Sequence, residues 1–164
     1  MPVPERKRRE WADRERLIVA AARELAEQQG WDAVTIRRLA ERIDRSQPVL
    51  YCHFRGKREI IGAVARQGAA ELAGALLAAT SAADGPRARI TALARAYLDF
   101  AEHNPAVYDA MFQLDLAGDV QPALCTEVFW AALHGLATLT RAGRLPPGNA
   151  ERRVELLVGR LVIV

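Results

Sequence analysis

The chain has 164 residues, of which 51% are hydrophobic, 6% aromatic and 26% charged. This length allows one or two small domains with a buried core, and abundant alanine with few aromatics favours packed helices over sheets. The N-terminus lacks the apolar core of a signal peptide, and the most apolar stretch, residues 62–83, contains Arg66 and Glu71, so we expect neither secretion nor a membrane span.

The two cysteines, Cys52 and Cys125, lie far apart and form no metal-binding or redox spacing. We therefore expect a cytoplasmic chain with reduced thiols, no metal and no cofactor. The net charge of +3 is unevenly distributed. Residues 1–60 hold 14 basic and 10 acidic residues, whereas the remainder holds 9 and 10. A basic first third on a nearly neutral body suits a polyanion-binding head, with a merely solvated surface as the alternative.

In chain order, residues 1–10 contain two prolines and the basic run Arg6–Arg9, which predict a disordered basic arm. Such an arm could lie along phosphates or in a minor groove, or could serve only solubility. A first helix is predicted over Asp13–Gln29, because Ile18 and later apolar residues recur at helical spacing. Gly30 follows at the usual C-terminal position, and Trp31 is expected in the core.

The next segment predicts a short helix with one apolar face. Ile36, Leu39, Ala40 and Ile43 recur at i, i+3, i+4 and i+7. Thr35 stands before them, where its hydroxyl can accept a hydrogen bond from a free amide of the first turn.

A tight turn and a second short helix follow. Asp44 tolerates a left-handed conformation, and Ser46 is a suitable N-cap residue. Pro48 falls in the first turn, where its missing N–H is not needed, and Leu50 and Phe54 share one face. Two helices this short need bracing by neighbours, so we expect a helix-turn-helix that presents its second helix to a DNA major groove.

The rest of the chain predicts further helices, over residues 57–79, 86–103, 106–114, 122–141 and 151–164. A linker at residues 80–86, a loop around Gly118 and a turn at residues 143–149 separate them. With no strand pattern, the expected fold is all-α, a three-helix DNA-binding head with a helix-turn-helix plus a helical-bundle body for ligand binding and dimerisation. The predicted domains are the arm at 1–10, the head at 11–56 and the body at 57–164.

At the head the chain resembles the TetR family of dimeric bacterial transcriptional regulators. The matching residues cover about the first third of the chain: Gly30, Trp31, Thr35, Leu39, Ala40, Ser46, Leu50, Tyr51, His53, Phe54 and Lys57. Two residues depart from the family pattern, Asp44 where the family has Gly and Arg45 where it usually has Val. The segment Trp130–Leu136 is similar to the Trp…His-Gly signature of one branch of the family's C-terminal domains.

The candidate DNA-binding residues are Thr35, Arg37, Arg45, Ser46, Gln47, Pro48, Val49, Tyr51, His53 and Lys57. Hydroxyls, cations and the histidine suit phosphate contacts, and the resemblance implies such contacts for Thr35, Tyr51 and Lys57. Gln47 and Arg37 suit base contacts, and Pro48 and Val49 suit thymine methyl groups. The similarity of this run to tetracycline-type repressors supports Gln47 and Arg37 as base readers. For Tyr51, a place at the edge of the core is the alternative.

The resemblance also implies a ligand pocket in the body. Its candidate lining is Tyr97, Phe100, Tyr108, Met111, Phe112, Phe129, Trp130 and His134, for which ordinary core packing is the alternative. The apolar end of the chain favours a dimer face on the last two helices, as the resemblance also implies. The candidate interface residues are Leu133, Leu136, Val154, Leu157, Val158 and Leu161.

These features favour a homodimeric, ligand-responsive repressor that releases a pseudo-palindromic duplex operator on binding a small apolar effector. A non-specific or architectural DNA-binding protein is one alternative. A helical enzyme is the other, but three histidines and two lone cysteines form no recognisable catalytic group, so we expect no enzyme. The expected partners are DNA, an effector and a second copy, without a membrane.

Overall fold

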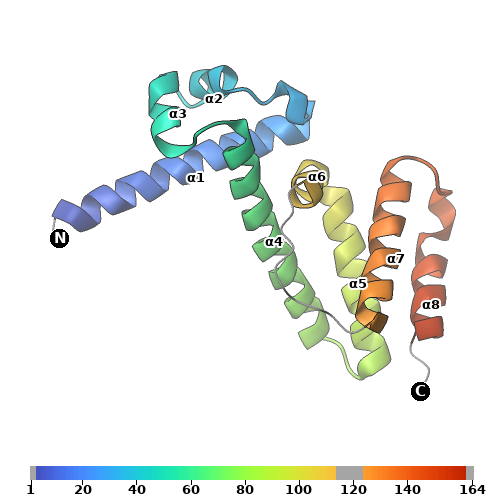
Figure 1. The fold of residues 1–164 in the computed structure, drawn as a ribbon. Helices are drawn as coiled ribbons and strands as arrows, with labels where there is room; N and C mark the ends of the chain where they lie inside the picture. Colours follow the sequence, from blue (N-terminus) through green and yellow to red (C-terminus); the bar gives the residue numbers. More distant parts are fainter. Residues whose placement is uncertain (1–2, 114–123, 162–164) are drawn as a thin grey trace. The chain divides into compact units, whose positions relative to one another are not determined.

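The computed structural model describes residues 3–113 and 124–161, and every regular element in these ranges is a helix (Figure 1). The all-α prediction is therefore confirmed. The chain divides into two compact units, residues 1–69 with 105–116 and residues 70–104 with 117–164. This division differs from the predicted domains, because the long helix α4 (Lys57–Ser81) runs across the boundary instead of starting the body.

The first helix, α1, spans Val3–Gln29, so the basic run Arg6–Arg9 is helical and not the disordered arm that the sequence predicts. Pro4 lies in the first turn, where a proline needs no hydrogen-bonded N–H, and no glycine or proline follows before Gly30. Gly30 ends the helix with a φ of 79°, a left-handed conformation that glycine adopts without strain. The basic residues thus belong to a regular helix.

Helix α2 (Ile36–Arg42) begins as the sequence predicts. The hydroxyl of Thr35 accepts a hydrogen bond from the amide of Arg38 at 3.2 Å. Asp44 then takes a φ of 52°, the left-handed conformation that the turn requires. A short 3-10 helix, Trp31–Ala33, joins α1 to this segment.

Helix α3 (Gln47–His53) follows directly, with Pro48 in its first turn. Ser46 occupies the N-cap position, as predicted, but its side chain makes no capping hydrogen bond. The two short helices pack against each other, and α2 also packs against α1. The predicted helix-turn-helix is present.

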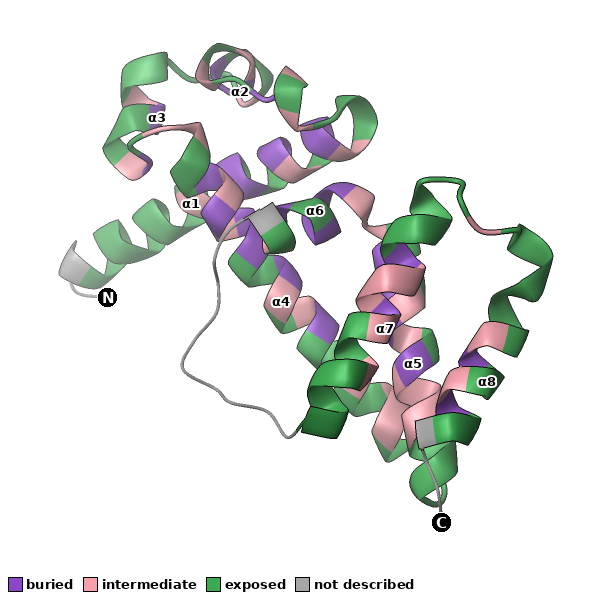
Figure 2. Cartoon of the chain, turned by 45° about the vertical axis from the view of Figure 1, so that its right-hand side comes forward, coloured by how far each residue is buried: buried purple, intermediate pink, exposed green. Residues whose placement is uncertain are grey.

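The core of the first unit is formed where these helices face one another, as the purple segments in Figure 2 show. Each of its central side chains is at most 1% exposed: Ile18, Leu25, Val34, Leu39, Leu50, Ile60 and Val64. This burial supplies the stability that two seven-residue helices lack in isolation, since short helices are marginal in water without tertiary packing.

Helix α4 is long and apolar enough, by length and composition, to cross a membrane. Ile60, Val64 and Ala65, in its first turns, are fully buried in the first unit. A helix in the core of a globular domain can be equally long and apolar. The packing of α4 inside the first unit therefore accounts for the apolar character of its first half.

Helix α6 (Pro105–Gln113) belongs to the first unit although it follows α5 in the chain. The carboxylate of Glu27 accepts hydrogen bonds from the amides of Ala106 and Val107, at 3.1 and 3.2 Å. The indole of Trp31 donates to the carbonyl of Ala106 at 2.8 Å. Since the first amides of a helix have no partner within it, Glu27 caps α6 and fixes it to α1.

The second unit is built on α5 (Pro86–His103), α7 (Leu124–Arg141) and α8 (Ala150–Leu161). Helix α5 packs against both α7 and α8, and these two pack against each other. The buried side chains of these three helices are Ala94, Tyr97, Phe100, Ala101, Leu133, Ala137, Val154 and Val158.

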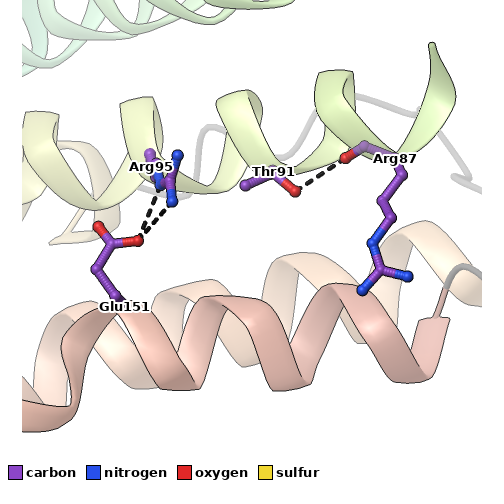
Figure 3. Close-up of polar contacts among 4 residues, drawn as sticks. All are labelled: Arg87, Thr91, Arg95 and Glu151. Atoms are coloured by element: carbon purple, nitrogen blue, oxygen red, sulfur yellow. Dashed lines mark hydrogen bonds and ion pairs between the residues drawn. The ribbon is translucent and has the colours of Figure 1, made fainter.

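A polar contact adds to this packing at the surface of the second unit (Figure 3). Arg95 of α5 donates through Nε and Nη2 to one carboxylate oxygen of Glu151 in α8, at 3.1 and 2.6 Å. Both side chains are more than half exposed, so water screens the pair and we expect a small contribution to stability. The contact joins the start of α8 to the middle of α5.

Candidate nucleic-acid interface

The outer face of α3 carries the predicted base readers. Gln47 and Pro48 are exposed, and the ring of Tyr51 is 54% exposed. Leu50 and Phe54 turn inward and are buried, which leaves the start of α3 free to approach another molecule. More than half of the surface of Tyr51 is exposed, which favours an outward position over a place at the edge of the core.

Two further positions on α3 are less simple. Val49, predicted to touch thymine methyl groups, is half-buried and offers only part of its side chain. Cys52, which the sequence analysis did not place in the site, is exposed beside Tyr51. The outward position of Cys52 agrees with the sequence, because Leu50 and Phe54 share the opposite, apolar face of the helix.

The predicted phosphate-contacting groups flank α3 in the chain. Thr35 and Ser46 are exposed at the starts of α2 and α3, and Lys57 is half-buried at the first residue of α4. The Thr35 oxygen accepts the capping bond, but its hydroxyl hydrogen stays available to donate to a phosphate oxygen. These groups suit a polyanion.

The two arginines of the predicted site are held by neighbouring groups. Arg37 donates through Nε to Glu41 at 2.9 Å, and the hydrogen bond and charge of Glu41 raise the pKa of Arg37. Arg45 donates to the carbonyl of Asp44 at 2.8 Å. Both side chains are exposed, so each can exchange its partner for a base or phosphate at modest cost.

His53 is a correction to the sequence-based site. Its side chain is only 1% exposed, because the ring of Trp11 lies over it with the centroids 4.0 Å apart. A phosphate cannot reach an imidazole in this position, so the expected direct contact is wrong. The sequence analysis missed Trp11 because it began the first helix at Asp13, although Trp11 precedes Ile18 by seven residues and so shares its face.

The predicted ligand-binding residues are divided between the two units. Tyr108, Met111 and Phe112 lie on α6 in the first unit, with the rings of Tyr108 and Phe112 4.7 Å apart. The others lie in the second unit, on α5 and α7: Tyr97, Phe100, Phe129, Trp130 and His134. Tyr97, Phe100 and Tyr108 are buried, whereas Trp130 is 50% exposed.

Two hollows in the second unit are lined by other residues. One, of about 230 Å³, lies among α5, α7 and α8, and its lining includes the apolar side chains of Leu98, Leu136 and Val154. Charged residues also line it, among them the paired Arg95 and Glu151. The other, of about 630 Å³, is an open groove between α7 and α8. None of the eight predicted ligand-binding residues lines either hollow.

The predicted dimer-interface residues also separate into two groups. Leu133, Val154 and Val158 are at most 3% exposed, because they pack inside the single chain, so a second copy cannot touch them. Leu136 and Leu157 line the groove between α7 and α8. The side chain of Leu161 and residues 162–164 lie outside the described residues.

The exposed apolar side chains of α7 and α8 include several that the sequence analysis did not select: Leu124, Val128, Leu139 and Leu156. Leu139 and Leu156 line the same groove as Leu136 and Leu157. In the described parts of the chain, no group of three or more His, Cys, Asp or Glu side chains could hold a metal ion.

Two short helices joined by a tight turn, the second with an exposed outer face and a buried inner one, define a helix-turn-helix protein. The family model for "Bacterial regulatory proteins, tetR family" matches residues 18–64, from the middle of α1 into α4. The chain belongs to the TetR family, as the sequence resemblance predicts.

Two of the relatives are named as transcription regulators. The transcriptional activator FasR of Mycolicibacterium smegmatis is 31% identical over 111 residues, which cover 68% of this chain and 51% of that protein. The class A tetracycline repressor of Escherichia coli is 44% identical over 54 residues, 33% of this chain and 25% of that protein. The chain thus spans about half, or less, of the length of these relatives.

A solved structure from Rhodococcus sp. RHA1, a protein of unknown function, extends the likeness to both units. It is 25% identical, with a TM-score of 0.77, and the match covers 90% of this chain and 92% of that one. The fold beyond the helix-turn-helix is therefore shared as well.

Proposed function

We propose that the chain is a dimeric, ligand-responsive transcription regulator that binds duplex DNA through α3. The exposed outer face of α3, with Gln47, Pro48 and Tyr51 outward and Leu50 buried, carries this proposal. Glutamine can pair with adenine in the major groove, and hydroxyls and cations beside it can hold the phosphates. Such a protein would act in the cytoplasm, where its DNA lies.

Dimerisation through α7 and α8 completes the proposal. The groove between them is lined by Leu136, Leu139, Leu156 and Leu157, and two of these side chains are well exposed in the single chain. Covering such a patch with its copy across a two-fold axis would form a four-helix interface. Two heads would then meet two half-sites about one helical turn apart.

Ligand response needs a body that holds an effector and a link to the head. The hollow of about 230 Å³ among α5, α7 and α8, with apolar and charged residues in its lining, has the character of a small-molecule site. Helix α6 follows α5 in the chain but is fixed to α1 by Glu27 and Trp31, so a shift of α5 would pull on the head. An effector acts only if it binds one arrangement more tightly than the other.

Repression is the direction of control that we propose, with release of the operator when a small apolar effector binds. The match of 54 residues of this chain to a tetracycline repressor supports it. The relative that matches over more of the chain is named as an activator, and this favours activation as the second candidate. A reporter gene under a promoter that carries the selected site separates the two, since its output rises on deletion of a repressor and falls on deletion of an activator.

Selection of bound fragments from random duplex DNA tests the proposal. We expect a pseudo-palindromic site whose half-sites lie about 10 base pairs apart. Binding should weaken with salt, with a slope of roughly −0.9 per neutralised phosphate. If the purified dimer retains all random duplexes equally, the protein is a non-specific DNA binder and the proposal fails.

A further inference from the structure

The N-terminal turns of α1 cover the end of α3. Trp11 and His53 stack with ring centroids 4.0 Å apart and planes inclined by 42°. His53 is almost completely buried, although Tyr51 and Cys52 beside it are exposed. Trp11 itself is 45% exposed, so one face of the indole meets the imidazole and the other meets water. The indole therefore acts as a lid on His53 and is not part of the central core.

One carboxylate joins the two rings. Glu15 Oε1 accepts a hydrogen bond from the indole N–H of Trp11 at 2.8 Å and lies 3.7 Å from Nδ1 of His53. This Nδ1 is buried and has no hydrogen-bond partner. A buried nitrogen left without a partner is costly, and Glu15 is the acceptor that faces it. The three side chains form a bridge from α1 to the last residue of α3.

Two of the three bridge residues, Trp11 and Glu15, lie before the part of the chain that matches the family model, which begins at residue 18. They belong to the N-terminal extension, by which we mean the residues of α1 that precede the matched segment. Helix α3 has only seven residues, so its orientation depends on the surfaces against which it packs. A contact at its last residue limits how far the whole helix can tilt.

We propose that this extension positions the DNA-reading helix. Trp11 and Glu15 hold His53 and thereby set the angle at which α3 presents Gln47 and Tyr51; neither touches DNA itself. This inference rests on the proposed role of α3 in binding DNA. Preorganising a recognition element improves affinity because less freedom is lost on binding.

The test compares Trp11→Ala with Trp11→Phe, Glu15→Gln and the control Leu17→Ala, in the full-length chain. Leu17 is on the same helix and is 47% exposed, close to the exposure of Trp11. Affinity for a duplex selected by the parent protein is measured by fluorescence anisotropy, well below the unfolding temperature and over a range of salt. Hydrogen exchange of the α3 amides is measured without DNA.

We expect Trp11→Ala to bind the duplex about twofold to tenfold more weakly, the fold-change that corresponds to losing one aromatic contact. The salt slope should stay that of the parent, because no phosphate contact is removed. Trp11→Phe should recover most of the affinity, Glu15→Gln should fall between, and Leu17→Ala should bind like the parent. The α3 amides should exchange faster in Trp11→Ala.

Other results would overturn the inference. If folded Trp11→Ala keeps the parent's affinity and amide exchange, the bridge positions nothing. If its salt slope also falls, the extension contacts phosphate directly. A purely structural role predicts a lower unfolding temperature with unchanged affinity where all variants are folded. If the parent selects no duplex, the proposed function fails, while amide exchange in α3 still decides whether the bridge holds that helix.

Discussion

Glu27 of α1 and Val107 of α6 are 80 positions apart in the chain, yet the carboxylate of Glu27 accepts a hydrogen bond from the Val107 amide at 3.2 Å. A second bond from the amide of Ala106 completes the cap. A carboxylate at a helix N-terminus both satisfies free amides and interacts favourably with the helix dipole. This contact makes α6 part of the first unit.

Glu27→Gln should lower the free energy of unfolding by about 1–2 kcal/mol, since charged hydrogen bonds to a helix terminus are lost or weakened. Glu24→Gln is the matched control on the same helix. It removes the charge from the 2.9 Å pair with Arg42 and from the acceptor of the exposed 3.3 Å hydrogen bond that Gln28 donates. Because Glu24 is 59% exposed, this change should cost less than about 1 kcal/mol. Urea unfolding measures both values. If the two substitutions lower the free energy of unfolding equally, the cap on α6 contributes no more to stability than an exposed ion pair.

Two glycines of α4 should respond in opposite directions to alanine. A Cβ on Gly68 would overlap Cγ1 of Val107 and meet the sulfur of Met111, so Gly68→Ala should destabilise the protein by about 1–3 kcal/mol. Gly74 has open space around its Cβ position, and Gly74→Ala should stabilise the helix by about 0.5–1 kcal/mol. Thermal unfolding separates the two. A stabilising Gly68→Ala would contradict the close packing of α4 on α6.

Gln47→Ala and Lys57→Ala should weaken DNA binding in different ways. Gln47 stands exposed at the start of α3, so its loss should relax base preference at one position, by about 1–3 kcal/mol of discrimination. Lys57 begins α4, and its loss should weaken all sequences alike and flatten the salt slope by about one. Anisotropy titrations on matched and mismatched duplexes measure both effects. If both variants bind DNA like the parent, this face of the head does not contact DNA.

Leu156→Glu and Val158→Glu, two positions apart on α8, should have different consequences. Leu156 is 61% exposed and lines the groove between α7 and α8, so a charge there should dissociate the proposed dimer into folded monomers. Val158 is 1% exposed inside its own subunit, and an unpaired buried carboxylate there should unfold the second unit. Sedimentation and circular dichroism distinguish these outcomes. A dimeric Leu156→Glu would place the interface on another face.

Local features of this protein follow from the amino-acid sequence. The spacing of Ile36, Leu39 and Ile43 predicts a helical face, and the cap of Thr35 and the left-handed Asp44 depend only on neighbouring residues. The family motif around Tyr51 is likewise contiguous, and the fold class and family that it indicated are confirmed. Each of these properties is decided within a turn or two of backbone.

The tertiary structure decided which partner each buried face meets. Periodicity marks Leu133 and Val158 as buried but cannot say whether their own subunit or a second copy covers them, and the structure places both inside the subunit. His53 carries the family motif, yet Trp11 covers it. From the sequence Glu27 is expected to be an ordinary surface residue, but in the structure it accepts a hydrogen bond from the first turn of α6. The apolar pattern of a sequence indicates which side chains are buried, because burial of apolar surface is favourable wherever it occurs. Which helix, or which second chain, covers those side chains depends on contacts between residues far apart in the sequence.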